Sequence, residues 1–275
     1  MSRWRNRLWY IANAPIAFRN WWAWPLPKLG IGITLKLRNG LLYHVRPGTS
    51  DLAVLNEASI RNPYLGTGYI KLSQDAVVVD VGANIGDFTV QVAALCPHGR
   101  VYAVEPVAEN VEMIARNREL NRLSNIYILQ VALGASEGHI GINVAGNESS
   151  AYFGADGGKT ENVRLTTLGR LMMENKIGRI DLLKLDCEGA EWDILPSSID
   201  ILPRIRQICM ELHLFRGRTA ERLATWLREQ GYEVTHTPTE WTGILWAVRP
   251  RSVKTCYVPG PNELCLGFVK PSSIL

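Results

Sequence analysis

The chain lacks several features that mark whole classes of protein. Its 275 residues contain five cysteines and no C-x-x-C spacing, so the sequence indicates no zinc site. Three of these cysteines lie within apolar runs, which favours buried thiols in a reducing, cytoplasmic compartment. No run of 18 apolar residues occurs, so we expect no bilayer-spanning helix, and we expect no signal peptide. With 47% hydrophobic residues, the chain can nevertheless bury a sizeable core.

Acidic side chains are missing from residues 1–50, which hold eight of the 30 lysines and arginines. The other 22 basic residues face 26 acidic ones, so the remainder has a net charge of −4 although the whole chain has +4. Residues 1–24 also hold five of the nine tryptophans. Tryptophan with arginine is typical of a membrane interface, but this segment could instead pack on the chain or on a second subunit. A nucleic-acid arm is disfavoured, because so many tryptophans do not suit a phosphate-tracking stripe.

What the chain does contain is a buried strand that runs into a glycine-bracketed turn. Residues 77–81 form a mostly β-branched run, and Gly82 and Gly86 bracket the turn before a helical pattern. A second apolar run, 101–104, ends in Glu105, where a βαβ unit places an acceptor for ribose hydroxyls. This arrangement predicts a nucleotide-type cofactor site, although a tight turn could also need glycines without any ligand.

The details of the turn distinguish between two cofactors. A dinucleotide fingerprint needs three glycines, but Asn84 occupies the middle place and Asp80 precedes the turn. A carboxylate there repels a pyrophosphate. It suits S-adenosylmethionine better, because that cofactor carries an amino group and a sulfonium and no phosphate.

Strands and helices alternate along the chain, which predicts an α/β fold with a doubly wound, mostly parallel sheet. An N-terminal hairpin and helix precede the sheet, because Asn39–Gly40 separates two apolar runs and Asp51 begins a helical pattern. Residues 138–159, rich in Gly, Asn and Ser, are expected to form some short strands. The expected main strands are 33–37, 41–45, 77–81, 101–104, 126–129, 180–185, 207–212, 233–237 and 244–248. The expected helices are those from Asp51 toward Pro63 and at 87–95, 108–120 and 220–230, the last capped by Thr219.

Several motifs together resemble one known family. They are Asp80–Gly86 with Thr89, Val104–Pro106 with Asn110, Asn117 and Asn121, Val131–Gly134, Thr166–Leu168, Lys184–Glu191, Met210–His213 and the lead-in Arg46–Asp51. Over roughly residues 40–250 the chain resembles the FkbM-type S-adenosylmethionine-dependent methyltransferases. The resemblance implies the Rossmann-like methyltransferase sheet, with its last strand antiparallel. One departure is Gly169, which stands where the family usually carries an acidic residue.

We accordingly expect four parts along the chain. They are a Trp/Arg-rich arm (1–30), a hairpin and helix lead-in (31–73), an S-adenosylmethionine-binding methyltransferase domain (74–250) and a C-terminal extension (251–275).

The resemblance also implies how the cofactor is held. Asp80 would hold its amino group directly or through water, Glu105 would bind its ribose, and Val131–Ala132 would lie against its adenine. The residues expected to bind the cofactor are Asp80, Gly82, Ala83, Asn84, Gly86, Thr89, Glu105, Val131 and Ala132.

Four side chains at the ends of the fourth and fifth strands are expected to face the acceptor: Asp186, Glu188, Glu211 and His213. Side chains two apart share a strand face, so they converge if these strands are neighbours. His213 is the expected general base, because a reference pKa of about 6.5 leaves imidazole mostly neutral at pH 7. Asp186 or Glu211 could orient it or take the proton instead. A metal on Asp186, Glu188 and His213 is conceivable from ligand type, but no spacing demands one and we expect none.

The resemblance therefore implies a methyltransferase that acts on a hydroxyl of a sugar, glycolipid or natural product. Two alternatives remain open: a catalytically silent scaffold that docks through its arm, and a nicotinamide-dependent oxidoreductase. The expected partners are a small-molecule or glycan acceptor and, through residues 1–24, a membrane surface. We expect no nucleic-acid partner, and the sequence does not fix the oligomeric state.

Overall fold

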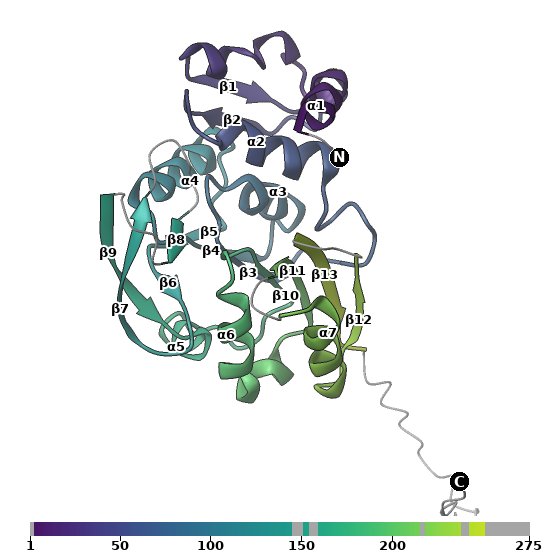
Figure 1. The fold of residues 1–275 in the computed structure, drawn as a ribbon, viewed down its shortest axis with the longest axis vertical. Coiled ribbons are helices and arrows are strands. Elements are labelled where there is room, and N and C mark those ends of the chain that lie inside the picture. The colour runs from purple at the N-terminus through teal and green to yellow at the C-terminus, as the bar shows by residue number, and fades with distance from the viewer. Residues whose placement is uncertain (1–2, 145–150, 154–158, 215–217, 238–241, 251–275) are drawn as a thin grey trace, which may run out of the picture.

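The computed structural model describes residues 3–144, 151–153, 159–214, 218–237 and 242–250, and shows a central sheet with helices on both faces (Figure 1). The sheet has seven strands in the order β12-β13-β11-β10-β3-β4-β5. Their bounds are β3 Val77–Val81, β4 Arg100–Val104, β5 Ile126–Leu129, β10 Leu182–Leu185, β11 Gln207–His213, β12 Glu233–His236 and β13 Thr242–Val248. Neighbouring strands from β11 to β5 run parallel, whereas β13 is antiparallel to both β11 and β12. The predicted α/β class, mostly parallel sheet and antiparallel last strand are confirmed.

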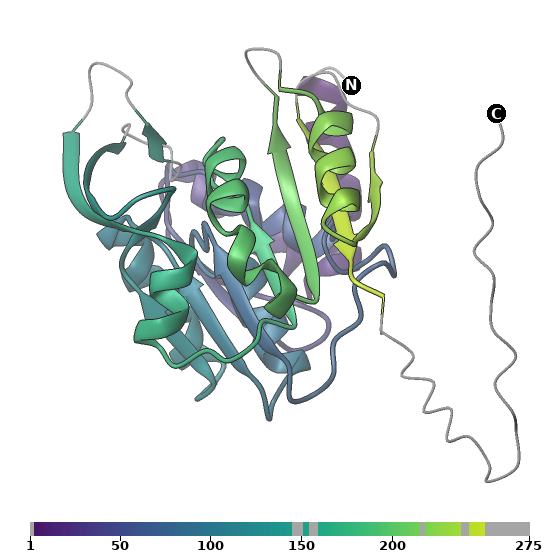
Figure 2. The same ribbon diagram turned by 90° about the horizontal axis from the view of Figure 1, so that it is seen from below.

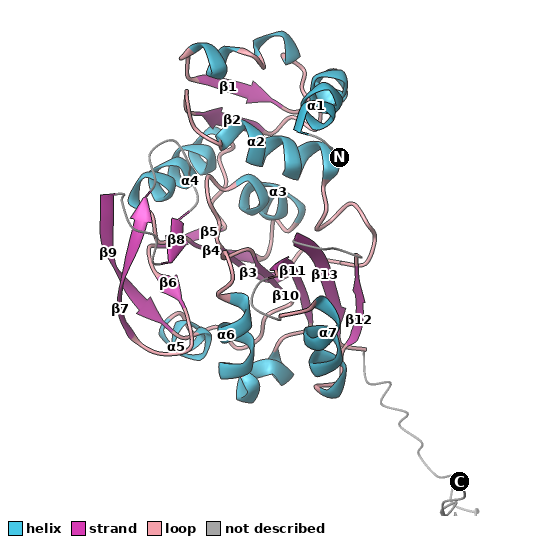
Figure 3. Cartoon of the chain, in the orientation of Figure 1, coloured by secondary structure: helices cyan, strands magenta, loops and turns pink. Residues whose placement is uncertain are grey.

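Helices cover the two faces of the sheet in sets that follow chain order (Figure 3). One face carries α2 Asp51–Asn56, α3 Asp87–Leu95 and α4 Ala108–Leu120, and the other carries α5 Leu168–Glu174, α6 Glu191–Ser197 and α7 Ala220–Glu229. The side chains of β3 alternate between them, with Val78 in one apolar core and Val77 and Val79 in the other. Because both faces are buried, this strand is apolar at nearly every position rather than at every second one.

A second, four-stranded sheet stands at the β5 end of the main sheet, opposite β12 and β13 (Figure 2). Its order is β6-β9-β7-β8, with bounds β6 Ala132–Leu133, β7 Gly138–Val144, β8 Ala151–Phe153 and β9 Lys159–Thr166. Short strands were predicted in this region, but β6 and β9 were not. Next along the chain, Thr167 caps α5 by accepting a hydrogen bond from the Arg170 N–H. Gly169 leaves the first turn of α5 without an acidic side chain, so no carboxylate complements the helix dipole there.

The N-terminal segment packs on the domain through part of its surface. It comprises α1 Arg3–Ala17, two 3₁₀ turns, the predicted hairpin of β1 Ile33–Lys36 and β2 Leu42–Val45, and a π-helical turn Glu57–Arg61 after α2. Phe18 and Trp24 are buried, and the Trp24 indole N–H donates to Asn56 Oδ1 at 2.9 Å. Trp21 and Trp22 are exposed. The packing alternative therefore holds for some of the segment's aromatic side chains and not for others.

The structure also bears on the expectations about membrane-spanning helices, cysteines and domain boundaries. Within the described ranges, no helix is both long and apolar enough to cross a membrane. Cys96 and Cys209 are buried and Cys187 is partly buried, all as free thiols. The predicted C-terminal extension, residues 251–275, lies outside the described residues, and the four expected domain boundaries stay predictions.

Candidate functional site

A cavity of about 280 Å³ opens at the carboxyl ends of the strands, where the chain order of the sheet reverses between β3 and β10. This is the place at which doubly wound folds bind ligands. The cavity is lined by Ser50, Val54, Glu57, Ala58, Tyr64, Val81, Gly82, Asn84, Asp87, Val104, Glu105, Pro106, Val131, Ala132, Leu133, Ile142, Lys184, Asp186, Cys187, Glu188 and Glu211.

The turn after β3 needs its first glycine for two reasons. Gly82 has φ +73°, and a Cβ there would lie 1.8 Å from the main-chain oxygen of Asp186. Gly82 therefore lets β3 approach the end of β10, a contact within the protein rather than with a ligand. Asn84 also has a left-handed backbone, and its Oδ1 is buried with no hydrogen-bond partner among the described residues. Since Asn84 lines the cavity, this oxygen is available to a donor on a ligand.

Glu105 connects the end of β4 to the turn after β3. Its Oε2 accepts the Asn84 N–H at 2.8 Å, and its Oε1 accepts from the Val107 N–H at 3.0 Å and the Asn110 side chain at 3.3 Å. Burial raises the pKa of this carboxyl to about 7, against the opposing effect of these donors and of Lys184. Glu105 lines the cavity, and a carboxylate has about four acceptor positions, so it can still receive a ligand hydroxyl.

Beyond Glu105 the cavity wall is apolar. Val131, Ala132 and Leu133 follow β5, and Ile142 comes from β7 of the small sheet. All four side chains are buried. They form a surface suited to a flat apolar group such as a base ring.

Asp80 takes a different place from the one predicted. It is fully buried and does not line the cavity, so it is not placed for direct contact with a cofactor amino group. Its Oδ2 accepts from the Thr89 hydroxyl at 2.5 Å, and its Oδ1 lies 3.2 Å from Lys184 Nζ. Lys184 Nζ in turn donates to the Gly82 carbonyl at 2.9 Å and lies 3.5 Å from Asp186 Oδ2. Asp80 thus positions Lys184, and Lys184 in turn contacts Gly82 and Asp186, which line the cavity.

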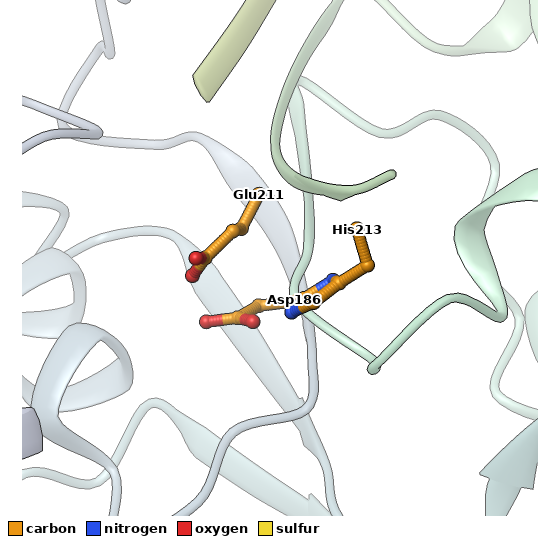
Figure 4. Close-up of side chains that lie close together, drawn as sticks. All are labelled: Asp186, Glu211 and His213. Atoms are coloured by element: carbon orange, nitrogen blue, oxygen red, sulfur yellow. The ribbon is translucent and has the colours of Figure 1, made fainter. Parts of the chain in front are cut away.

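The predicted acceptor side chains do converge. Side-chain ligand atoms of Asp186, Glu211 and His213 all lie within 4.8 Å of one another, and Figure 4 shows the two carboxylates beside the imidazole ring. Strands β10 and β11 are neighbours, as this convergence required. Glu188 Oε2 lies 3.3 Å from His213 Nε2. The Tyr64 hydroxyl donates to Asp186 Oδ2 at 3.1 Å.

His213 is held by a carboxylate that sequence reasoning did not assign to it. Glu191 Oε1, fully buried, accepts the His213 main-chain N–H at 3.0 Å and lies 3.2 Å from His213 Nδ1. Despite the opposing effect of burial, the hydrogen bond to Glu191 and the nearby charges of Glu191, Glu188 and Glu211 raise the pKa of His213 to about 9. These contacts favour a protonated imidazole, whereas the sequence led us to expect a mostly neutral one at pH 7. Burial and the charge of Asp186 raise the pKa of Glu211 to about 8.

The charge of the cavity wall is one-sided. It carries six acidic side chains and a single lysine among the described residues: Glu57, Asp87, Glu105, Asp186, Glu188, Glu211 and Lys184. The lysine is already engaged by Asp80 and Asp186. A cavity of this kind favours a ligand that brings positive charge.

The predicted cofactor-binding residues divide into two groups. Gly82, Asn84, Glu105, Val131 and Ala132 line the cavity. The cavity lining does not include Asp80, Ala83, Gly86 or Thr89.

Four residues were missed: Glu57, Tyr64, Lys184 and Glu191. Only Lys184 had a usable signal, since it stands two positions before Asp186 on one strand. The other three reach the site from separate elements through long-range packing.

Comparison with known proteins agrees with this geometry. The sequence profile of the methyltransferase FkbM domain matches residues 80–234. The chain is 29% identical over 235 residues to the 31-O-demethyl-FK506 methyltransferase FkbM of Streptomyces tacrolimicus, covering 73% of this chain and 89% of that protein. It is 31% identical over 235 residues to the AMB antimetabolite synthetase AmbE of Pseudomonas aeruginosa, covering 66% of this chain and only 10% of that protein.

A solved structure shares the fold. The crystal structure of methyltransferase FkbM from Methylobacillus flagellatus superposes with a TM-score of 0.50 at 17% identity, over 72% of this chain and 53% of that chain. Because the family profile covers more than half of the 275 residues, the assignment does not depend on any single relative. The chain is a methyltransferase-fold protein that belongs to the FkbM methyltransferase domain family.

Proposed function

We propose that this protein uses S-adenosylmethionine to methylate a hydroxyl oxygen. One observation carries the proposal: a single cavity joins a nucleotide-type half, built on Glu105 and an apolar wall, to an acidic half built on Asp186 and Glu211. A cofactor in the first half would present its reactive group toward the second.

The residues of the first half fit this cofactor. The buried, unpartnered Asn84 Oδ1 can accept a hydrogen bond from its amino group, and Glu105 can accept one from a ribose hydroxyl. Val131, Ala132 and Ile142 offer the adenine ring an apolar surface. The excess of carboxylates suits a ligand that carries a sulfonium and an ammonium group.

When bound, S-adenosylmethionine supplies a methyl group on a positively charged sulfur, which is a good leaving group. The protein has to hold the acceptor oxygen in line with that methyl group and to receive the hydroxyl proton. Asp186, Glu211 and His213 come together at the acidic half, where an acceptor oxygen would lie. The bound cofactor would supply the methyl group and keep the carbon–sulfur electron pair on its sulfur, and the cluster of Asp186, Glu211 and His213 would receive the hydroxyl proton.

The proton acceptor is best described as the cluster rather than as one residue. His213 and Glu211 lie close enough to share their protons, so the proton of the acceptor would pass to whichever basic group of the cluster does not already carry one. Glu191 keeps the imidazole fixed in this cluster.

The name of one relative suggests a class of methyl acceptor. The Streptomyces relative is named as a methyltransferase of 31-O-demethyl-FK506, a hydroxyl-bearing natural product. We propose an acceptor of that kind, or a sugar hydroxyl of a glycan or glycolipid.

The alternatives are less well supported. A nicotinamide dinucleotide would place a pyrophosphate in a cavity with six acidic side chains, an electrostatically unfavourable match. A silent scaffold would not need the convergence of Asp186, Glu211 and His213.

The test is methyl transfer to a panel of sugars and polyketide alcohols, followed by mass spectrometry. Asp186→Asn should lower turnover roughly 10²-fold or more while cofactor affinity is kept. Glu119→Gln, at an exposed position on α4, is the matched control and should leave turnover unchanged. A wild-type protein that binds the cofactor but gives no product with any hydroxyl acceptor would contradict O-methylation.

A further inference from the structure

The acceptor half of the cavity has the composition of a metal site. Asp186 and Glu211 offer carboxylate oxygens and His213 offers an imidazole nitrogen, and the three ligand atoms lie within 4.8 Å of one another (Figure 4). We propose that these three side chains bind a divalent cation, best matched by Mn²⁺, and that this cation holds the acceptor oxygen. This inference rests on the proposed function for its role, but the binding can be measured without any reaction.

The ligand set selects the class of ion. Carboxylates suit Mg²⁺ and Mn²⁺, whereas imidazole suits the transition metals, so one nitrogen with two oxygens fits Mn²⁺ better than Mg²⁺. Three protein ligands also leave coordination positions open, which a site that binds a substrate needs.

The surrounding contacts are those of a supported metal site. A metal-binding histidine is usually oriented by a carboxylate on its other ring nitrogen. Glu191, fully buried, lies 3.2 Å from His213 Nδ1 and so leaves Nε2 toward the cluster. Asp186 is oriented in the same way, because Tyr64 and Lys184 both contact its Oδ2, at 3.1 and 3.5 Å.

The acidic side chains around the cluster also favour the binding of a cation. Glu188 Oε2 lies 3.3 Å from His213 Nε2, so a third carboxylate borders the site. Glu57 lines the same cavity and adds another. Lys184 is the one basic side chain among the described residues of the cavity wall, and it already contacts Asp80 and Asp186. A divalent cation would relieve the repulsion among these carboxylates.

A cation at this place has a clear use. Bound to the hydroxyl oxygen of the acceptor, it would lower the pKa of that hydroxyl and fix its position. With Asp186, Glu211 and His213 bound to the cation, the hydroxyl proton would leave to Glu188 or to solvent instead of to these three side chains. No metal-ligand spacing is visible along the chain, because Asp186 follows β10 whereas Glu211 and His213 lie on β11.

The test is a titration of the chelator-treated, full-length protein with MnCl₂, without cofactor or acceptor, followed by the loss of the free Mn²⁺ electron paramagnetic resonance signal. We expect saturable binding of one ion per chain. Asp186→Asn and Glu211→Gln should each weaken it about ten-fold or more. Glu57→Gln removes one carboxylate from the same cavity but no ligand, and should change the affinity about three-fold or less. Thermal unfolding checks that each variant is folded.

Two results would overturn the proposal. One is no saturable binding up to millimolar Mn²⁺. The other is equal weakening by Glu57→Gln and Glu211→Gln, which would indicate an adventitious ion attracted by charge only. Measuring cofactor binding on the same samples separates the two proposals. Cofactor binding and methyl transfer that a chelator does not affect would refute only the cation, whereas Mn²⁺ binding without cofactor binding would refute only the proposed function.

A separate observation concerns the N-terminal segment. Eleven large hydrophobic side chains are exposed on the described part of the chain, and six of them fall between residues 9 and 31. These six are Trp9, Ile16, Trp21, Trp22, Leu29 and Ile31. Exposed basic side chains accompany them at Arg19, Lys28 and Arg38, while residues 1–50 contain no acidic residue.

We infer that the N-terminal segment docks on an anionic membrane through these exposed side chains. Tryptophans suit the headgroup level of a bilayer, and basic side chains suit anionic lipids. The complete absence of acidic residues favours a negatively charged partner over a neutral one.

Flotation with phosphatidylcholine vesicles, with and without 30% phosphatidylglycerol, tests this inference. We expect binding to the anionic vesicles only, weakened by salt. A Trp21→Ser, Trp22→Ser double variant should reduce binding about ten-fold or more. The control, Met173→Ser with Ile199→Ser, removes two exposed side chains elsewhere and should not. Equal binding by both variants, no binding to vesicles, or a change of oligomeric state in the tryptophan variant would refute a membrane-docking surface.

Discussion

The affinity for S-adenosylmethionine should depend on pH through Glu105. Its carboxyl lies at the cavity wall, and burial raises its pKa to about 7 in the free protein. A carboxylate can accept hydrogen bonds from ribose hydroxyls with both oxygens, whereas the protonated form loses acceptor capacity and charge. Cofactor binding should therefore favour the ionised form, and protons should compete with it.

The size of this effect follows from the pKa. With a pKa of about 7, roughly nine-tenths of Glu105 is ionised at pH 8, one-tenth at pH 6 and one-hundredth at pH 5. If only the ionised form binds, affinity falls about ten-fold between pH 8 and pH 6 and about 100-fold by pH 5. Because Glu105 loses its negative charge on protonation, the affinity for the cofactor decreases as the pH falls.

The assay is isothermal titration calorimetry from pH 5 to pH 9 at constant ionic strength. Other groups also titrate in this range. They are Asp87 and Glu211 in the same cavity, whose pKa values burial raises to about 8, His213 beside them, with a pKa of about 9, and the cofactor's own amino group, near 8. Glu105→Gln keeps all of these groups and should lose only the component centred near pH 7. Affinity that is constant between pH 5 and pH 7, or identical pH dependence in wild type and variant, would refute the role of Glu105.

Three further outcomes follow from the packing of the site. Lys184→Met should lower the free energy of unfolding by about 3–5 kcal/mol, because it leaves Asp80 buried without its charge partner. A denaturant titration measures this loss, and the double variant with Asp80→Asn should recover most of the lost stability. Gly82→Ala should prevent folding, since its Cβ would overlap a main-chain oxygen, whereas Gly86→Ala should cost only about 1–2 kcal/mol, measured by thermal unfolding. Cys96, buried with its pKa raised to about 11, should stay unlabelled by iodoacetamide at pH 8 in peptide mapping.

The sequence was informative where a local pattern determines structure. The strand at Val77–Val81 and helices α3 and α4 were predicted with the observed bounds, because β-branched runs and turn residues specify them locally. The convergence of Asp186 with Glu211 also followed, once their strands were taken as neighbours.

The rest depended on contacts that no local pattern records. Asp80 looked like a ligand contact because it ends a strand beside a glycine turn, yet its neighbour across the sheet is Lys184, which pairs with it. Glu191 stands 22 positions before His213, and only the packing of α6 beside β11 brings them together. Helix α1 was not expected, because Pro15 interrupts its segment. Packing stabilises this helix, since Ala14 lies in the hydrophobic core.

The most direct test of the proposed function is the binding of S-adenosylmethionine to the purified protein, with NAD measured alongside by calorimetry. We expect S-adenosylmethionine to bind one per chain at micromolar concentration and NAD not to bind, because the cavity wall carries six acidic side chains and a single lysine among the described residues. Binding of NAD alone, or of neither compound, would contradict the assignment of this cavity to the methyl donor.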